Sequence, residues 1–111
     1  MPSREEFLRL VWEQVINSPM TGAWIHNTTA TANQDANAPF ADAGHALARL
    51  LAKGADHRDL SLVARLASYE TVFSFLYMLD DPGIDGNAFM LHESLLGADP
   101  SGKEGRPGSA P

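Results

Sequence analysis

Apolar residues recur at helical spacing near the beginning of the chain. They are Phe7, Leu8, Val11, Trp12, Val15 and Ile16. Charged and amide side chains fill the positions between them, which is typical of an amphipathic helix with one buried face. Ser3 stands three residues before Glu6, the spacing of a capping box. We therefore predict a first helix that begins after Ser3 and ends at Asn17-Ser18-Pro19, because proline cannot continue a helix.

Two shorter helices are predicted next. One opens at Ser18-Pro19 and buries Trp24, although Gly22 lowers its helix propensity. The other begins near Pro39, after a polar loop at 33–37, and ends at Gly54, a residue suited to a C-terminal cap. Its apolar face carries Phe40, Ala43, Leu47, Leu50 and Leu51.

The longest apolar stretch predicts a fourth helix from about residue 59 to 79, capped by Asp56 or Asp59. Its first half is amphipathic and its second half is apolar nearly all round. A helix of this kind is usually central and surrounded by others. Because the chain is small, we expect the other helices to cover it incompletely and a partner subunit to supply part of the cover.

A fifth helix is predicted after Asp85, ending at Gly97. The residues 99–111 show no apolar periodicity and are expected to form a mobile, Gly/Pro-rich C-terminal tail. The predicted fold is thus all-α, a single domain at 1–98 with four to five helices bundled around the helix at about 59–79.

Composition narrows the function. The 111 residues include no cysteine, which excludes disulfide frameworks, thiolate nucleophiles and zinc fingers, and fits a reducing cytoplasm. The net charge of −6 argues against a broad nucleic-acid-binding surface. Arg9, Glu13 and Gln14 interrupt the apolar residues near the beginning of the chain, so we expect no secretory signal. Arg65, Glu70 and three serines make 60–79 costly in hydrocarbon, so we also expect no membrane interaction.

Metal binding finds little support in the spacing of the histidines. His92-Glu93 resembles the start of a zinc-protease motif, but Leu96 stands where the second histidine is required. The segment 81–93 resembles a calcium loop, yet Gly83 at its third position and His92 at its twelfth supply no carboxylate. We predict neither a metal nor a cofactor.

Glu70 is the most unusual polar residue, because it lies in the most apolar helix. A buried carboxylate needs a partner and is typical of functional sites, and His26, His92 or Arg49 could approach it through space. The alternative is a narrow, solvent-facing polar strip that Glu70 shares with Ser74. Trp24 combines with the polar residues that follow it into a second candidate, a small-ligand pocket. The candidate ligand-binding residues are Trp24, His26, Glu70, Tyr77 and His92, and no catalytic residue is predicted.

The segments 22–28 (GAWIHNT) and 77–81 (YMLDD) resemble small bacterial helical domains of unknown function. The resemblance covers about the first ninety residues. It implies a helical, cytoplasmic bacterial protein and brings no catalytic residues with it.

Together these observations favour a non-catalytic protein-interaction or regulatory module that acts as a homodimer. One alternative is a small enzyme or a ligand- or metal-binding protein that uses Glu70 with His26 or His92. Another is an immunity- or antitoxin-like inhibitor whose acidic surface binds a basic partner.

Overall fold

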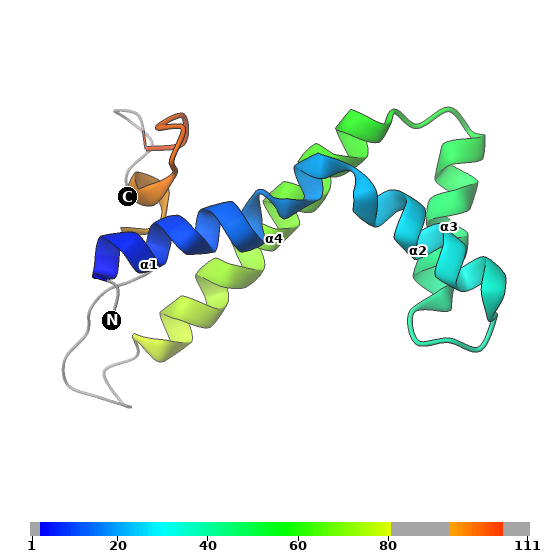
Figure 1. Ribbon diagram of the computed structural model, residues 1–111, viewed down its shortest axis with the longest axis horizontal. Coiled ribbons are helices and arrows are strands. Elements are labelled where there is room, and N and C mark those ends of the chain that lie inside the picture. Colours follow the sequence, from blue (N-terminus) through cyan, green and yellow to red (C-terminus); the bar gives the residue numbers. More distant parts are fainter. Residues whose placement is uncertain (1–2, 81–93, 106–111) are drawn as a thin grey trace. The chain divides into compact units, whose positions relative to one another are not determined.

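The computed structural model describes residues 3–80 and 94–105, and over these residues the chain is helical with no strand (Figure 1). The α-helices are α1 (Arg4–Val11), α2 (Ala23–Gln34), α3 (Ala41–Ala52) and α4 (His57–Leu79). A π-helical turn at Trp12–Ile16 continues α1, and short 3-10 turns lie at Ser18–Thr21 and Leu96–Ala98. The predicted all-α class is confirmed. The predicted helix after Asp85 falls mostly on residues 81–93, outside the described part.

The chain divides into two compact units. We call Met1–Ser18 with Leu66–Pro111 the terminal unit, and Pro19–Arg65 the middle unit. The long helix α4 contributes its first nine residues, 57–65, to the middle unit and the rest to the terminal unit.

The first helix begins as predicted, at a hydrogen-bonded cap. The Ser3 hydroxyl accepts from the Glu6 backbone N–H at 3.1 Å and donates to the Glu6 carboxylate at 3.2 Å. The π-helical turn that follows was not predicted: the Asn17 N–H donates to the Trp12 carbonyl, five residues back, at 2.9 Å. The predicted apolar stripe is also wider than the buried face, because Phe7 and Val15 are exposed.

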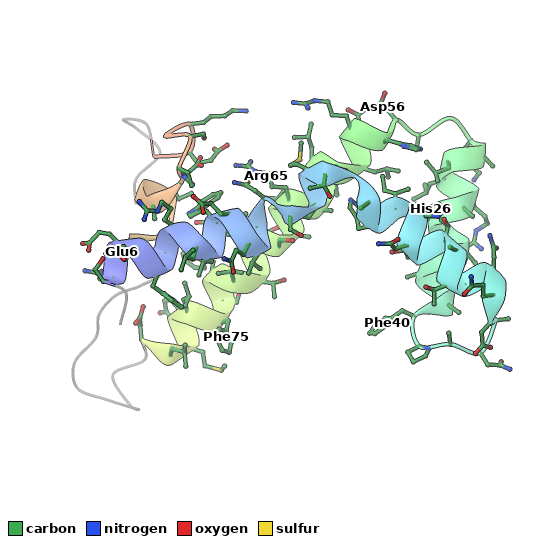
Figure 2. The ribbon with its side chains drawn as sticks, in the orientation of Figure 1. Glu6, His26, Phe40, Asp56, Arg65 and Phe75 are labelled. Atoms are coloured by element: carbon green, nitrogen blue, oxygen red, sulfur yellow. The ribbon has the colours of Figure 1, made fainter. Side chains whose placement is uncertain are left out.

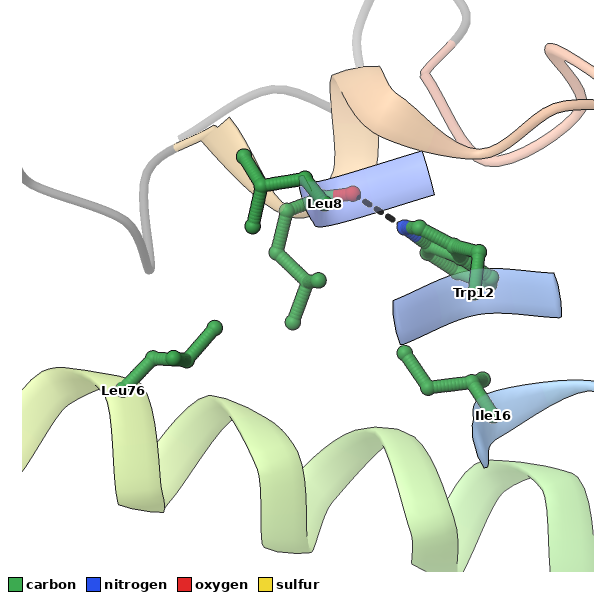
Figure 3. Packing of buried hydrophobic residues seen from close by; sticks show 5 residues of the cluster. Leu8, Trp12, Ile16 and Leu76 are labelled. Carbon is green, nitrogen blue, oxygen red and sulfur yellow. Dashed lines mark hydrogen bonds between the residues drawn. The ribbon is translucent and has the colours of Figure 1, made fainter. Parts of the chain in front are cut away.

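Large side chains form the core of the terminal unit. Leu8, Trp12 and Ile16 follow one another at intervals of four and meet Leu76 of α4 and Leu95 (Figure 3). Each is at most 3% exposed. The Trp12 indole N–H donates to the Leu95 carbonyl, so the one polar group of this side chain is satisfied inside the core.

The middle unit is built on an α2–α3 helical hairpin in which the two backbones approach closely (Figure 1). A Cβ atom added at Gly44 would lie 2.5 Å from the Ala32 Cβ and 2.6 Å from the Thr28 carbonyl oxygen. Gly22, in the left-handed conformation (φ 81°), separates the turn at Ser18–Thr21 from α2, where the sequence predicted one helix. Gly54 follows Lys53, the C-cap residue of α3, and adopts the left-handed conformation with φ 96°, as its predicted capping role requires.

The fourth helix begins at a cap supplied by Asp56, the first of the two predicted candidates. Its carboxylate accepts from the backbone N–H groups of Arg58 at 2.7 Å and Asp59 at 3.3 Å. Within the described ranges, α4 is the one helix that is long and apolar enough to cross a membrane. Its most apolar window of 18 residues has a mean hydropathy of 1.2, and 6% of that window is buried. Arg65 and Glu70 oppose such a location, and the absence of membrane interaction stays a prediction.

A hydrogen-bonded turn follows the last short helix. Asp99 is 5% exposed, and its carboxylate accepts from the backbone N–H groups of Ser101 (3.0 Å) and Glu104 (3.1 Å) and from the Ser101 hydroxyl (2.9 Å). The segment predicted as a tail at 99–111 therefore opens with an ordered turn, and its residues 106–111 lie outside the described part.

Candidate functional site

Trp24 and His26 both lie on α2, in the middle unit. The Trp24 indole N–H donates to the Pro19 carbonyl at 3.0 Å and to the hydroxyl of buried Ser61 at 3.2 Å. These bonds tie α2 to the turn before it and to the first part of α4, so Trp24 has a structural role here. His26 is exposed to solvent (Figure 2).

Glu70 and Tyr77 lie on α4, in the terminal unit. Both are exposed, and Tyr77 retains 58% of its accessible surface. Glu70 is therefore not a buried carboxylate. It lies on a solvent-facing polar strip with exposed Ser74, as the second of the two predictions described. The predicted partners of Glu70 belong elsewhere: His26 is a middle-unit residue and His92 lies outside the described residues. Their pairing with Glu70 therefore stays a prediction.

Four aromatic rings form a continuous ladder in the terminal unit. The ring centroids are 5.9 Å apart for Trp12 and Tyr69, 6.0 Å for Tyr69 and Phe73, and 6.3 Å for Phe73 and Tyr77. The ladder begins at buried Trp12 and ends at exposed Tyr77, so it leads from the core to the surface. Burial raises the pKa of the Tyr69 phenol.

A shallow groove of about 260 Å³ runs beside this ladder. It is lined by Tyr69, Glu70, Phe73 and Ser74. Two aromatic rings supply its apolar wall, while a carboxylate and a hydroxyl supply its polar wall. No described residue donates a hydrogen bond to the Glu70 carboxylate or pairs with it. We call these four residues the aromatic groove.

The ladder was missed in the sequence although its signal is visible there. Tyr69, Phe73 and Tyr77 stand at intervals of four, and residues four apart are neighbours on one side of a helix. The contribution of Trp12 has no such signal, because it depends on how α1 packs against α4.

A second feature of α4 is the exposed apolar side that faces away from the core. Phe75, Met78 and Leu79 retain 55%, 55% and 47% of their accessible surface. Phe75 is labelled in Figure 2. They are spaced three and four residues apart and are therefore neighbours on the helix. We call these three residues the apolar patch. Between residues 71 and 79 the chain carries no charge.

Metal binding gains no support from the described residues, among which no group of three or more His, Asp or Glu side chains comes together. The segment 81–93, which resembles a calcium loop and contains His92, lies outside those residues.

Comparison with known proteins gives no assignment. No family model matches the chain, and neither the search of curated proteins nor that of solved structures gives a match.

Proposed function

We propose that this chain is a non-catalytic protein-interaction module that acts as a homodimer through the apolar patch of α4. The observation that carries the proposal is the half-exposure of Phe75, Met78 and Leu79 side by side on one helix. Adjacent large apolar side chains on a surface are typical of interaction sites, whereas isolated ones are ordinary.

The chemistry of the patch favours a second copy as the occupant. A two-fold interface brings a surface against its own copy, so any charge near the axis meets a like charge. The stretch 71–79 is uncharged and therefore escapes this repulsion. Aromatic residues and methionine are also enriched at interfaces from which charges are depleted.

The size of the patch sets what else the dimer needs. A stable interface covers about 800 Å² on each partner, more than three half-exposed side chains provide. The patch therefore supplies the centre of the interface, and the exposed, uncharged residues Ala67 and Thr71 on the preceding turns of α4 supply part of its rim.

The test is the molar mass of the purified protein by size-exclusion chromatography with light scattering, over a range of micromolar concentrations. The full chain is expected to be a dimer. Phe75→Glu and Met78→Glu each place two charges in the dimer centre and should raise the dissociation constant by about a hundredfold or more.

Val15→Glu provides the matched control. Val15 is 49% exposed in the same unit but lies on another helix, so the new charge should leave the dimer intact. Circular dichroism of each variant verifies that the helices are retained. A wild-type chain that is monomeric throughout, or a dimer that Phe75→Glu does not weaken, overturns the proposal.

A further inference from the structure

The aromatic groove combines two features that attract the same kind of ligand. The faces of aromatic rings are electron-rich and attract cations, more strongly arginine than lysine in protein structures. The Glu70 carboxylate adds a full negative charge beside the rings of Tyr69 and Phe73. The groove contains no basic residue among the four that line it.

The carboxylate is also available. Glu70 is exposed and has no hydrogen-bond or ion-pair partner in the described part of the chain. The next aromatic ring of the ladder, Tyr77, stacks on Phe73 with an angle of 28° between the ring planes. A planar cation in the groove would meet the rings of Tyr69 and Phe73 together with the Glu70 carboxylate.

We propose that the aromatic groove binds an arginine side chain of a basic partner protein. A guanidinium group fits better than an ammonium group, because it is flat, stacks on aromatic rings and can bond a carboxylate through two N–H groups. The net charge of −6 on this chain attracts such a partner from a distance.

The strength of the available contacts favours an arginine side chain of a protein over a free small cation as the ligand. An exposed cation–π contact and an exposed ion pair each improve a dissociation constant by only about two- to fivefold. A small cation held by these contacts alone would bind too weakly to remain bound. An arginine within a polypeptide adds the contacts of its apolar stem and of its neighbours, for which Leu66, 58% exposed and four residues before Glu70, provides a surface.

This site is independent of the proposed dimer. Phe75 follows Glu70 by five residues, which turns it about 140° around the helix. The groove and most of the apolar patch therefore lie on different sides of α4, and one can be occupied while the other is free.

The experiment uses the full chain labelled with ¹⁵N and short peptides as probes. Acetyl-Leu-Arg-Leu-amide, whose leucines can contact Leu66, is titrated while the backbone amide shifts of Glu70 and Ser74 are followed by NMR. The matched ligand is the same peptide with citrulline, which has the shape of arginine without its charge. Methylguanidinium chloride tests a free small cation. The arginine peptide should give saturable shifts at these residues that weaken with salt, methylguanidinium weaker ones, and the citrulline peptide none.

Variants locate the binding. Glu70→Gln keeps the shape of the side chain and should raise the dissociation constant about two- to fivefold. Glu13→Gln removes an exposed carboxylate from the same unit outside the groove and should have no effect. Equal shifts with arginine and citrulline, equal effects of the two variants, or no saturation overturns the proposal. Repeating the titration on Phe75→Glu separates this outcome from that of the dimer test, because the groove should bind equally well in the monomer.

Discussion

The interior of each compact unit is packed in a different way. The terminal unit has a core of large side chains, with Leu8, Trp12 and Ile16 packed against Leu76 and Leu95. The middle unit depends on the close approach of two helices, made possible at Gly44 by the absence of a side chain. The first arrangement buries much apolar area per residue, whereas the second depends on a precise fit of backbone against backbone.

This difference bears on function. The hairpin packs small residues such as Ala32 and Gly44 at its contact, and its exposed large apolar side chains, Phe40 and Leu50, lie ten residues apart in the sequence. The terminal unit, by contrast, carries more large apolar side chains than its core accommodates, and those of α4 remain at the surface as the apolar patch and the end of the aromatic ladder. Both proposed interaction sites therefore belong to the terminal unit. Substitutions in the core of each unit test whether the two units are stabilised in these different ways.

The largest effect is expected at the centre of the terminal core. Trp12 is 1% exposed, and replacing a buried tryptophan by alanine typically lowers the free energy of unfolding by about 3–5 kcal/mol. Trp12→Ala should show this loss in urea denaturation followed by circular dichroism. Trp12→Phe keeps a ring but loses the indole bond to the Leu95 carbonyl, which still accepts from the Ala98 N–H, so its loss should be intermediate.

Phe7→Ala is the control for this prediction. Phe7 is an aromatic residue of the same helix but is 42% exposed, so its removal should cost about 1 kcal/mol or less. Similar losses for Trp12→Ala and Phe7→Ala would contradict the description of the terminal core.

The middle unit should be most sensitive at Gly44. In Gly44→Ala the new methyl group would meet the Thr28 carbonyl oxygen at 2.6 Å, and backbone cannot move aside as a flexible side chain can. Overpacking of this kind costs about 1–3 kcal/mol, of which the better helix propensity of alanine recovers up to about 1 kcal/mol. The net loss should appear as a lower urea midpoint.

Gly97→Ala is the matched glycine substitution. A Cβ atom at Gly97 has no neighbour within 4 Å, so stability should stay within about 0.5 kcal/mol of wild type. If Gly44→Ala were equally harmless, the hairpin would not depend on close backbone contact.

Features that depend on neighbouring residues along the chain were predicted well from the sequence. The cap at Ser3, the cap at Asp56 and the glycine that ends α3 each use groups a few residues apart, and periodicity alone located the long helix. The exposure of Glu70 had been left open between two alternatives, because a single helix does not show which of its sides another helix covers.

Features that depend on distant residues were not predictable in this way. The bond from Trp12 to Leu95 joins residues 83 positions apart, and no local pattern announces it. The same limit applies to the division into two units and to the close approach at Gly44. The π-helical turn at Trp12–Ile16 is local, but it contains no glycine or proline, and so nothing in the sequence indicates that the helix takes up an extra residue there.

A smaller effect, expected in both units, comes from the helix caps. Asp56→Ala removes the acceptor for two backbone N–H groups at the start of α4, and Ser3→Ala removes the acceptor for one at the start of α1. Each should lower the free energy of unfolding by about 1 kcal/mol. Asp59→Ala, in the first turn of α4 but not at its cap, should lose only about 0.3–1 kcal/mol of dipole interaction. A loss at Asp59 larger than that at Asp56 would mean that the cap is misassigned.

The smallest effect should have the opposite sign. Phe40 precedes α3 with φ 65°, and it is the one non-glycine residue of the described ranges in the left-handed region (Figure 2). It is also 83% exposed, so its ring contributes little packing to offset the backbone strain. Asparagine adopts this conformation more readily, so Phe40→Asn should raise the free energy of unfolding by about 0.5 kcal/mol. Phe7→Asn, at a right-handed helical position, should lower it instead. A loss of stability in Phe40→Asn would show that the ring, despite its exposure, makes contacts that hold the hairpin of the middle unit together.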